Sequence, residues 1–285
     1  MDLLGAGNKV LRRVLVARGV RSSVNTVRGH QVHSYRLEGR TGSTPVVLLH
    51  GLGGQANGFS RTLFGLAKRF GPVCAIDLPG HGFSPVPAGG PLGLEEQVRV
   101  VGAFLDEVVG AKAFLVGNSL GGAMAIALAH ETPERLRALG LVAPAGARVS
   151  AERQAGTLEA LNVGTSGQAR ALTRRLFHRP PLAMLLLSGE LKTMYGSPAV
   201  KRVFAETKPT DFIAPEVLAS LSMPTLLVWG ASEKVLPFEG IDYFREHLPR
   251  HAEVHVVRGF GHIPQMERPR ELVEILTRFA DRSRF

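Results

Sequence analysis

A serine in a tight, glycine-framed turn is the first candidate for chemistry in this sequence. Residues 117–121 read Gly-Asn-Ser-Leu-Gly, with Ser119 between an apolar run and a segment of small residues. The apolar run predicts a buried strand and the small-residue segment predicts a helix. In such a turn the flanking glycines let strand and helix pack closely, so that the serine hydroxyl projects outward at the helix N-terminus. The pattern predicts that Ser119 is a nucleophile; the alternative is an incidental serine in a strand-to-helix turn.

A histidine and a carboxylate that would serve this serine come late in the chain. A serine hydroxyl is a weak nucleophile until a base removes its proton, and that base needs an orienting carboxylate. His262 lies in a glycine-flanked loop after the predicted strand 253–257, and Glu233 lies in the loop after the predicted strand 224–229. Because the carboxyl ends of parallel strands open on one edge of a sheet, we expect Ser119, Glu233 and His262 to converge there.

The elements that must position these residues alternate between strands and helices. A hairpin is expected at 20–27 and 31–37, and further strands at 45–50, 73–77, 113–116, 138–142, 224–229 and 253–257. Helices are expected at 59–70, 94–109, 121–130, 238–247 and 271–279. Valine-rich strands that alternate with helices predict the α/β class, with a mostly parallel, doubly wound sheet covered on both faces.

The alternation stops between residues 144 and 212, where helix-like segments follow one another without a strand. An insertion at the carboxyl ends of the strands would lie over the ligand crevice, so we predict a helical cap at 144–212 and a core made of 20–143 and 213–285. Residues 181–187 are apolar all round. They either line a channel for an acyl chain, with Met184 as a substrate contact, or are simply buried on the core.

Taken together, these motifs resemble the α/β-hydrolase fold family, and the similarity runs from about residue 20 to residue 279. Besides the turn at Ser119, it includes the His50-Gly51 loop, the segment Asp-Leu-Pro-Gly-His-Gly-Phe-Ser at 77–84, and Gly261-His262 followed by Pro264 and Glu267. The resemblance implies a serine esterase or lipase with a cap domain and a catalytic triad. It places the oxyanion hole at the backbone N–H groups of Leu52 and Leu120, and it implies no cofactor. Gly51, Met184 and Ile263 are the expected substrate contacts.

Glu233 departs from the family pattern, which usually has aspartate in this loop. Glutamate is a known substitute in such triads and is long enough to reach His262. The alternative is a surface glutamate beside Lys234. Asp242 is the nearest other carboxylate, but it falls inside a predicted helix and is expected to point away.

The expected reaction is hydrolysis of a carboxylic ester, by a carboxylesterase or an enzyme similar to monoacylglycerol lipase. The runner-up is a carbon–carbon bond hydrolase of the meta-cleavage-product type, because the elbows of those enzymes are similar. They commonly have tryptophan directly after the catalytic histidine, where this chain has Ile263. The predicted cap also has no obvious arginine for their dienolate acid, although Arg174 and Arg175 stay open for that role.

Two other classes of protein share some of these sequence features. Residues 51–56 match a loose dinucleotide fingerprint, with Asp77 at the end of the next strand, which would suit a nicotinamide enzyme. Two strands precede this motif, however, and Pro79 and Gly80 follow Asp77 almost directly. A non-catalytic receptor on the same fold is the other class; such proteins usually lack a member of the triad, whereas this chain has all three.

Composition indicates an ordinary soluble globular protein, with 45% hydrophobic and 20% charged residues in a chain of 285. A single cysteine excludes an internal disulfide, and Cys74 is expected in a buried strand. The net charge of +10 is concentrated in residues 1–40, with 8 Lys+Arg against 2 Asp+Glu, and 147–212, with 10 against 5. Nucleic-acid binding is not expected, since helix-turn-helix and zinc spacings are absent, and no histidine pattern indicates a metal.

The N-terminal residues 1–19 predict a basic amphipathic helix. Its apolar residues are Leu3, Leu4, Val10, Leu11, Val14 and Leu15, with Lys9, Arg12 and Arg13 beside them. Such a helix either contacts an anionic membrane surface or packs on the domain. The expected location is cytoplasmic, with a peripheral membrane contact in the first case. His30 and His33 are expected as exposed strand residues. His50 and His81 are expected to hold loops in place by hydrogen bonds; the alternative for these two is a part in catalysis.

Overall fold

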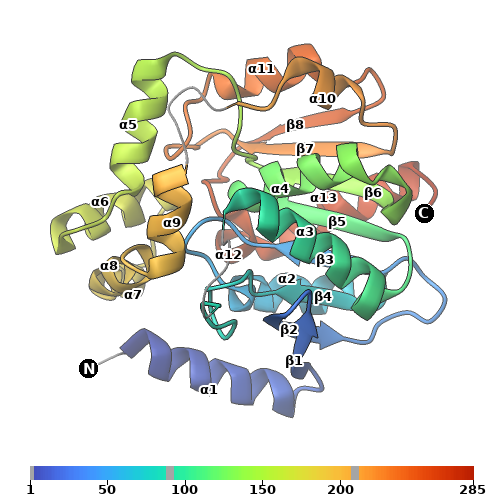
Figure 1. Ribbon diagram of the computed structural model, residues 1–285, viewed down its shortest axis with the longest axis horizontal. Helices are drawn as coiled ribbons and strands as arrows, with labels where there is room; N and C mark the ends of the chain where they lie inside the picture. Colours follow the sequence, from blue (N-terminus) through green and yellow to red (C-terminus); the bar gives the residue numbers. More distant parts are fainter. Residues whose placement is uncertain (1–2, 88–92, 207–211) are drawn as a thin grey trace.

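The computed structural model describes residues 3–87, 93–206 and 212–285 (Figure 1). Its centre is one eight-stranded sheet with the order β1-β2-β4-β3-β5-β6-β7-β8. The strands are β1 (Arg21–Val27), β2 (His30–Leu37), β3 (Val46–Leu49), β4 (Val73–Ile76), β5 (Ala113–Asn118), β6 (Leu136–Val142), β7 (Thr225–Gly230) and β8 (Glu253–Val257). β1 and β2 form the antiparallel hairpin, β2 pairs antiparallel with β4, and the pairs from β4 to β8 are all parallel. The expected mostly parallel α/β sheet is confirmed.

Helices cover both faces of this sheet (Figure 1). One face packs against α3 (Leu94–Phe104), α4 (Leu120–Glu131), α10 (Pro215–Ala219) and α11 (Gly240–His247). The other face packs against α2 (Ser60–Leu66) and α13 (Pro269–Arg282). Strands β3, β4, β5 and β7 are buried along their whole length, which explains their continuous apolar sequences. The remaining short elements of the core are η1 (Ala56–Phe59), the π-helical turn η2 (Leu105–Val109), η3 (Pro133–Arg135) and α12 (Pro264–Glu267).

Between β6 and β7 the chain forms a group of helices, although the two strands are neighbours in the sheet. These helices lie together to one side of the sheet, at the left in Figure 1. They are α5 (Ala151–Leu161), α6 (Ser166–Leu176), α7 (Leu182–Leu186), η4 (Ser188–Glu190), α8 (Leu191–Tyr195) and α9 (Pro198–Glu206). Their shared apolar cluster includes Leu172, Phe177 and Tyr195, and Leu52 and Ile263 from the core elements pack against it. These helices occupy the segment predicted as the cap, of which residues 207–211 lie outside the described part of the chain. The division into cap and core stays a prediction.

Helix α1 (Leu3–Ala17) lies along the lower edge of the molecule in Figure 1. Leu15 is buried and Leu11 packs beside it against the face covered by α2 and α13. Val10 and Val14, by contrast, are 59% and 47% exposed. Of the apolar residues expected on one face, Leu11 and Leu15 therefore pack on the domain, whereas Val10 and Val14 face solvent. The side chains of Leu3 and Leu4 lie outside the described part of the structure. In the described part of the chain, no helix combines the length and the apolar character that crossing a membrane takes.

Candidate active site

Ser119 lies at the sharp turn between β5 and α4. Its backbone has φ 56° and ψ −119°, a combination that costs a non-glycine residue free energy and that persists only where its surroundings fix it. The Ser119 N–H donates to the Val142 carbonyl at 3.0 Å, and the Ser119 carbonyl accepts from the N–H groups of Gly122, Ala123 and Ala145. These bonds hold the strained residue in place and present its hydroxyl at the start of α4.

Glycines are required on both sides of this turn for packing reasons. A Cβ on Gly117 would lie 2.2 Å from the Gly121 carbonyl oxygen, and one on Gly121 would lie 2.6 Å from that of His50. A Cβ on Gly51 would approach Ser119 Cβ to 2.9 Å. All three contacts are closer than real Cβ atoms approach, so strand, helix and the loop after β3 meet at this point only because side chains are missing.

His262 and Glu233 meet beneath the same edge of the sheet. The Nδ1 atom of His262 lies 2.8 Å from Oε2 of Glu233, and both side chains are buried. The other carboxylate oxygen accepts hydrogen bonds from the N–H groups of Val235 and Leu236, at 2.7 and 3.0 Å. Burial alone would raise the pKa of Glu233, but the charge and hydrogen bond of His262 and these two N–H groups outweigh it and hold the pKa below its usual value. Glu233 is therefore a buried residue and not a surface glutamate, and its hydrogen bond engages Nδ1 of His262 and not Nε2.

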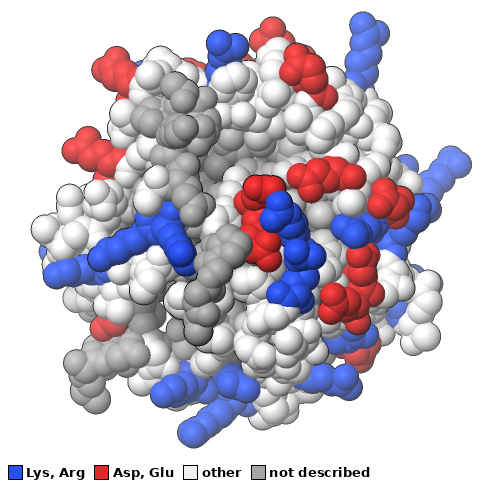
Figure 2. Space-filling view, in the orientation of Figure 1, with Lys and Arg blue, Asp and Glu red and all other residues white. Residues whose placement is uncertain are grey.

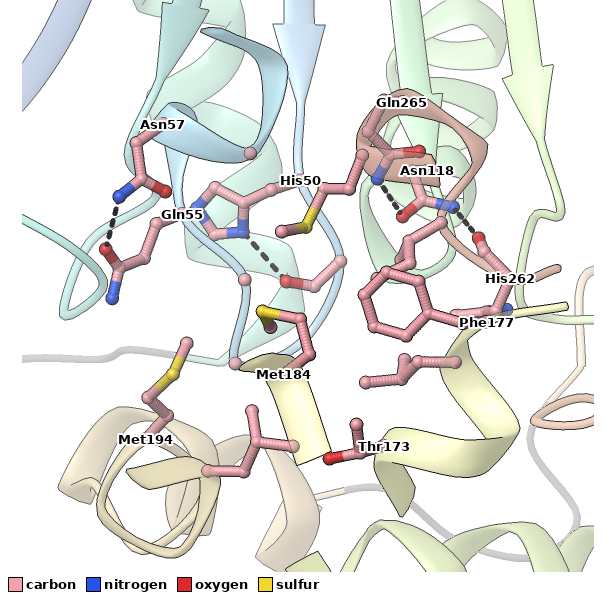
Figure 3. Close-up of a pocket in the computed structure, with 18 of the residues that line it drawn as sticks. His50, Gln55, Asn57, Asn118, Thr173, Phe177, Met184, Met194, His262 and Gln265 are labelled. Carbon is pink, nitrogen blue, oxygen red and sulfur yellow. Dashed lines mark hydrogen bonds between the residues drawn. The ribbon is translucent and has the colours of Figure 1, made fainter. Parts of the chain in front are cut away.

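Asn118 connects the serine turn to the histidine loop. Its Nδ2 donates to the carbonyls of Val142 and His262, each at 2.9 Å, and its Oδ1 accepts from Nε2 of Gln265 at 2.9 Å. Figure 3 shows Asn118 between Gln265 and His262. These bonds fix the backbone of His262 relative to the residue next to Ser119, a link that no pattern in the sequence indicates.

Glu267 fastens the end of α6 to the histidine loop. Its carboxylate accepts from the N–H groups of Gly261 at 3.0 Å, His178 at 3.1 Å and Arg179 at 2.9 Å. The His262 N–H also donates to the Leu176 carbonyl at 2.9 Å. The first turn after α6 and the loop that carries His262 thus form one hydrogen-bonded unit.

His50 and His81 pin loops, as expected from the sequence. The Leu78 N–H donates to His50 Nε2 at 3.1 Å, so the proton of His50 lies on Nδ1, which donates to the Gly51 carbonyl at 2.8 Å. His81 Nδ1 lies 3.2 Å from the Pro79 carbonyl. Burial lowers the pKa of both, to about 4 for His81, and keeps the rings neutral.

Asp77 and His33 differ from the sequence expectations. His33 is fully buried and its Nδ1 lies 2.7 Å from Asp77 Oδ2, so its expected exposure is wrong. Asp77 also accepts from the N–H groups of Ala56 and Phe83, at 2.7 and 3.0 Å. Burial by itself would raise the pKa of Asp77, but these hydrogen bonds hold it below its usual range. Asp77 thus joins β2, β4 and the loop after β3, and both of its carboxylate oxygens accept hydrogen bonds from the protein. It gives no support to a dinucleotide site.

A cavity of about 520 Å³ opens over Ser119. Its lining includes the predicted residues Ser119, His262, Leu52, Gly51, Met184 and Ile263. The apolar part of its wall comes mostly from the helices between β6 and β7, with Leu161, Leu176, Phe177, Met184, Leu187, Leu191, Met194, Ile263 and Met266. Leu120 is the first residue of α4, where a backbone N–H has no acceptor within the helix. Asp242 lies exposed on α11 and pairs with Arg245, as expected of a residue that points away.

The segment 181–187 is only partly as expected. Pro181, Met184 and Leu187 line the cavity, but Leu182 and Leu186 are 76% and 79% exposed. Arg174 and Arg175 are exposed on α6. Cys74 is buried in β4, as expected.

The fold has a counterpart among known protein families. A family model described as "alpha/beta hydrolase fold" matches residues 44–269. The chain is a member of the α/β-hydrolase fold family. Of solved structures, a membrane phospholipase A described as a bacterial virulence factor is similar to this hydrolase with a TM-score of 0.85 and 26% identity, over 99% of this chain and 91% of that chain.

Similar sequences carry several different activities. The dihydrolipoyllysine-residue acetyltransferase component of the acetoin cleaving system from Pseudomonas putida is 31% identical over 262 residues, covering 88% of this chain. The match covers 67% of the Pseudomonas putida protein. The same component from Cupriavidus necator is 28% identical over 82% of this chain, and that match covers 63% of the Cupriavidus necator protein. A 2-hydroxy-6-oxo-2,4-heptadienoate hydrolase of Pseudomonas putida is 25% identical over 95% of this chain and 97% of its own length. The chain is therefore a hydrolase by family, and these similarities do not identify its substrate.

Proposed function

We propose that this hydrolase cleaves carboxylic esters through an acyl-enzyme on Ser119. The observation that carries the proposal is the 2.8 Å contact between His262 Nδ1 and Glu233 Oε2 in the loop that borders the Ser119 cavity. His262 takes the serine proton as Ser119 attacks the ester carbonyl, and then gives it to the leaving alcohol. Glu233 holds His262 in the required tautomer and stabilises its charge. A water molecule, activated by His262, then releases the acid.

The negative oxygen of the tetrahedral intermediate needs hydrogen-bond donors that are already in place. The N–H groups of Leu52 and Leu120 serve this role in the proposal, one from the loop after β3 and one from the first turn of α4. Removal of one such donor typically costs on the order of 100-fold or more in rate. This chemistry requires no cofactor.

The substrate is an ester with a medium or longer acyl chain, similar to a monoacylglycerol. Support comes from the apolar wall of the cavity, to which Met184 and Ile263 contribute. A wall of this kind lowers the free energy of a hydrocarbon chain by removing it from water, at about 25 cal/mol for each Å² buried. Gly51 allows the ester to approach Ser119 closely.

A peripheral contact with a lipid surface belongs to the same proposal. Val10 and Val14 on α1 and Leu182 and Leu186 on α7 are exposed, and both helices also contribute residues to the cavity wall. Lys and Arg side chains lie along the lower edge of the molecule in Figure 2, where Figure 1 places α1. Exposed apolar side chains beside basic ones suit the surface of an anionic bilayer.

Carbon–carbon bond hydrolysis is the second candidate, because the heptadienoate hydrolase is similar over 97% of its own length. Ile263 in place of the tryptophan common in such enzymes, and the exposure of Arg174 and Arg175, speak for the ester reaction. Absorbance loss of a meta-cleavage product tests this candidate directly.

The experiment that tests the ester proposal is hydrolysis of p-nitrophenyl esters from acetate to palmitate by the wild type and by Ser119→Ala. We expect the variant to lose activity and the wild type to prefer the longer chains. Labelling with an organophosphonate should reach one equivalent in the wild type and none in the variant. A wild type that cleaves no ester would contradict the proposal.

A further inference from the structure

The cavity over Ser119 has a second, polar wall that the proposed reaction does not use. The apolar wall comes mostly from the helices between β6 and β7. The polar wall comes from α1, η1 with the residue before it, and the start of α2, and it consists of Asn8, Gln55, Asn57, Ser60 and Arg61. In Figure 3, Gln55 and Asn57 lie on the side of the cavity opposite His262. A pocket with two such unlike walls fits a ligand with one apolar and one polar part.

Three carboxamides in this wall are hydrogen-bonded to one another. Asn8 Nδ2 donates to Gln55 Oε1 at 2.7 Å, and Asn57 Nδ2 donates to Asn8 Oδ1 at 2.6 Å and to Gln55 Oε1 at 3.4 Å. The bonds join residues 47 and 49 positions apart in the sequence. They fix the positions of the three side chains, so that little rotamer entropy is lost when a ligand binds.

The same bonds determine what the three residues can still offer. They engage the oxygens of Asn8 and Gln55, which leaves Nε2 of Gln55 as a donor and Oδ1 of Asn57 as an acceptor, among the bonds of the described residues. A donor and an acceptor on one wall match the hydroxyl groups of a polyol, each of which both accepts and donates. They suit a carboxylate or a hydrocarbon poorly.

The wall is within reach of the reacting bond. Gln55 follows Leu52 by three residues, so their Cα atoms are at most about 11 Å apart, and a hydrogen bond from the Gly54 N–H to the Gly51 carbonyl tightens the turn between them. The Gln55 side chain itself spans part of this distance. A polyol attached directly to the ester oxygen therefore extends toward these amides while the acyl chain follows the apolar wall.

We propose that Asn8, Gln55 and Asn57 form a subsite for the hydroxyl groups of the alcohol part of the substrate, a neutral polyol such as glycerol. This inference rests on the proposed esterase function and assigns part of the substrate site to α1. A merely structural role, in which the amides only hold α1 on the domain, makes a different prediction: loss of an amide would then affect all esters alike.

The test compares two esters of the same acyl chain, a 1-monoacylglycerol and the methyl ester, in the wild type, Gln55→Ala, Asn57→Ala and the control Asn162→Ala. Asn162 is an exposed amide at the end of α5. We expect the ratio of kcat/KM for the monoacylglycerol to that for the methyl ester to fall by about 3- to 10-fold in the first two variants, the value of one neutral hydrogen bond. The ratio should not change in Asn162→Ala.

A second measurement does not depend on how well the variants fold. A 1-O-alkylglycerol ether is not hydrolysed, and it should inhibit the wild type several-fold more strongly than the matching alkyl methyl ether. An unchanged ratio in both amide variants, or equal inhibition by the two ethers, would overturn the subsite while leaving hydrolysis of the methyl ester, and so the esterase proposal, intact. A wild type that cleaves neither ester would overturn both.

Discussion

Replacing Glu233 by glutamine probes the proposed mechanism at a single atom. Glu233 Oε1 accepts from the N–H groups of Val235 and Leu236, and Oε2 faces His262 Nδ1. In Glu233→Gln the carbonyl oxygen keeps the two backbone bonds, because the flipped amide would place N–H groups against N–H groups and lose about 1 to 3 kcal/mol for each unsatisfied donor. The amide nitrogen must then face His262.

An N–H donor opposite Nδ1 favours the imidazole tautomer that carries its proton on Nε2. That tautomer cannot accept the proton of Ser119. The size and packing of the side chain are unchanged, so the loss falls on the chemical step. We expect kcat to fall by about 10⁴-fold, which corresponds to about 5.5 kcal/mol in the activation free energy.

The assay is hydrolysis of a p-nitrophenyl ester, with urea unfolding to show that the variant is folded. Asp242→Asn is the matched control, because Asp242 is an exposed carboxylate on α11. It should keep wild-type activity. If Glu233→Gln stays within tenfold of the wild type while Asp242→Asn is slow, the assignment of the orienting carboxylate is wrong.

Three further predictions concern stability, measured as the free energy of unfolding in urea. The pKa of His81 is about 4 in the folded chain against an ordinary 6.5, so only the unfolded chain gains a proton at this residue as the pH falls between these values. Between pH 6.5 and 5 the wild type should lose about 1.6 kcal/mol more than His81→Gln, and an equal loss would contradict this. Gly117→Ala should lower the free energy of unfolding by about 3 kcal/mol, because the new Cβ would lie 2.2 Å from a backbone oxygen. Gly156→Ala, in a helix with open space around it, should not lower it, and equal effects would refute the packing argument. Asp77→Ala should lower the free energy of unfolding by about 3 to 5 kcal/mol, because it leaves the buried partners of Asp77 unpaired. Glu38→Ala, which breaks an exposed ion pair, should lower it by less than about 1 kcal/mol; similar losses would contradict a stabilising role for the buried network.

The parts of the site that lie next to strands could be predicted from the sequence. An apolar run that ends in Gly-x-Ser-x-Gly specifies a buried strand, a turn and a helix within a dozen residues. His262 and Glu233 follow predicted strands of the same sheet, and parallel pairing brings the ends of such strands together. The order of the strands did not need to be known, because only the shared edge mattered.

Residues that depend on contacts between distant segments could not be predicted. His33 lies in β2, but its ring contacts Ser22 and Asp77 by hydrogen bonds and packs against Phe83, so it is buried where its own sequence suggests an exposed position. Asn8 reaches Gln55 only because α1 folds back along the mouth of the cavity. Local periodicity does not predict contacts between segments far apart in the sequence, since it indicates only which face of an element is apolar.

The attachment of Glu267 to the turn after α6 bears on how freely this part of the molecule could be exchanged between related enzymes. Helical insertions over a common core invite chimeras, in which one enzyme's insertion is grafted on another's scaffold. Here His178 and Arg179 lie by position in the segment predicted as the cap, but their N–H groups donate to Glu267, which also accepts from Gly261 beside His262. Because the groups at 176–179 that make these bonds are backbone N–H and C=O groups, a graft can change these side chains but must keep the path of the backbone there. A graft that shifts this backbone would release the loop that carries His262.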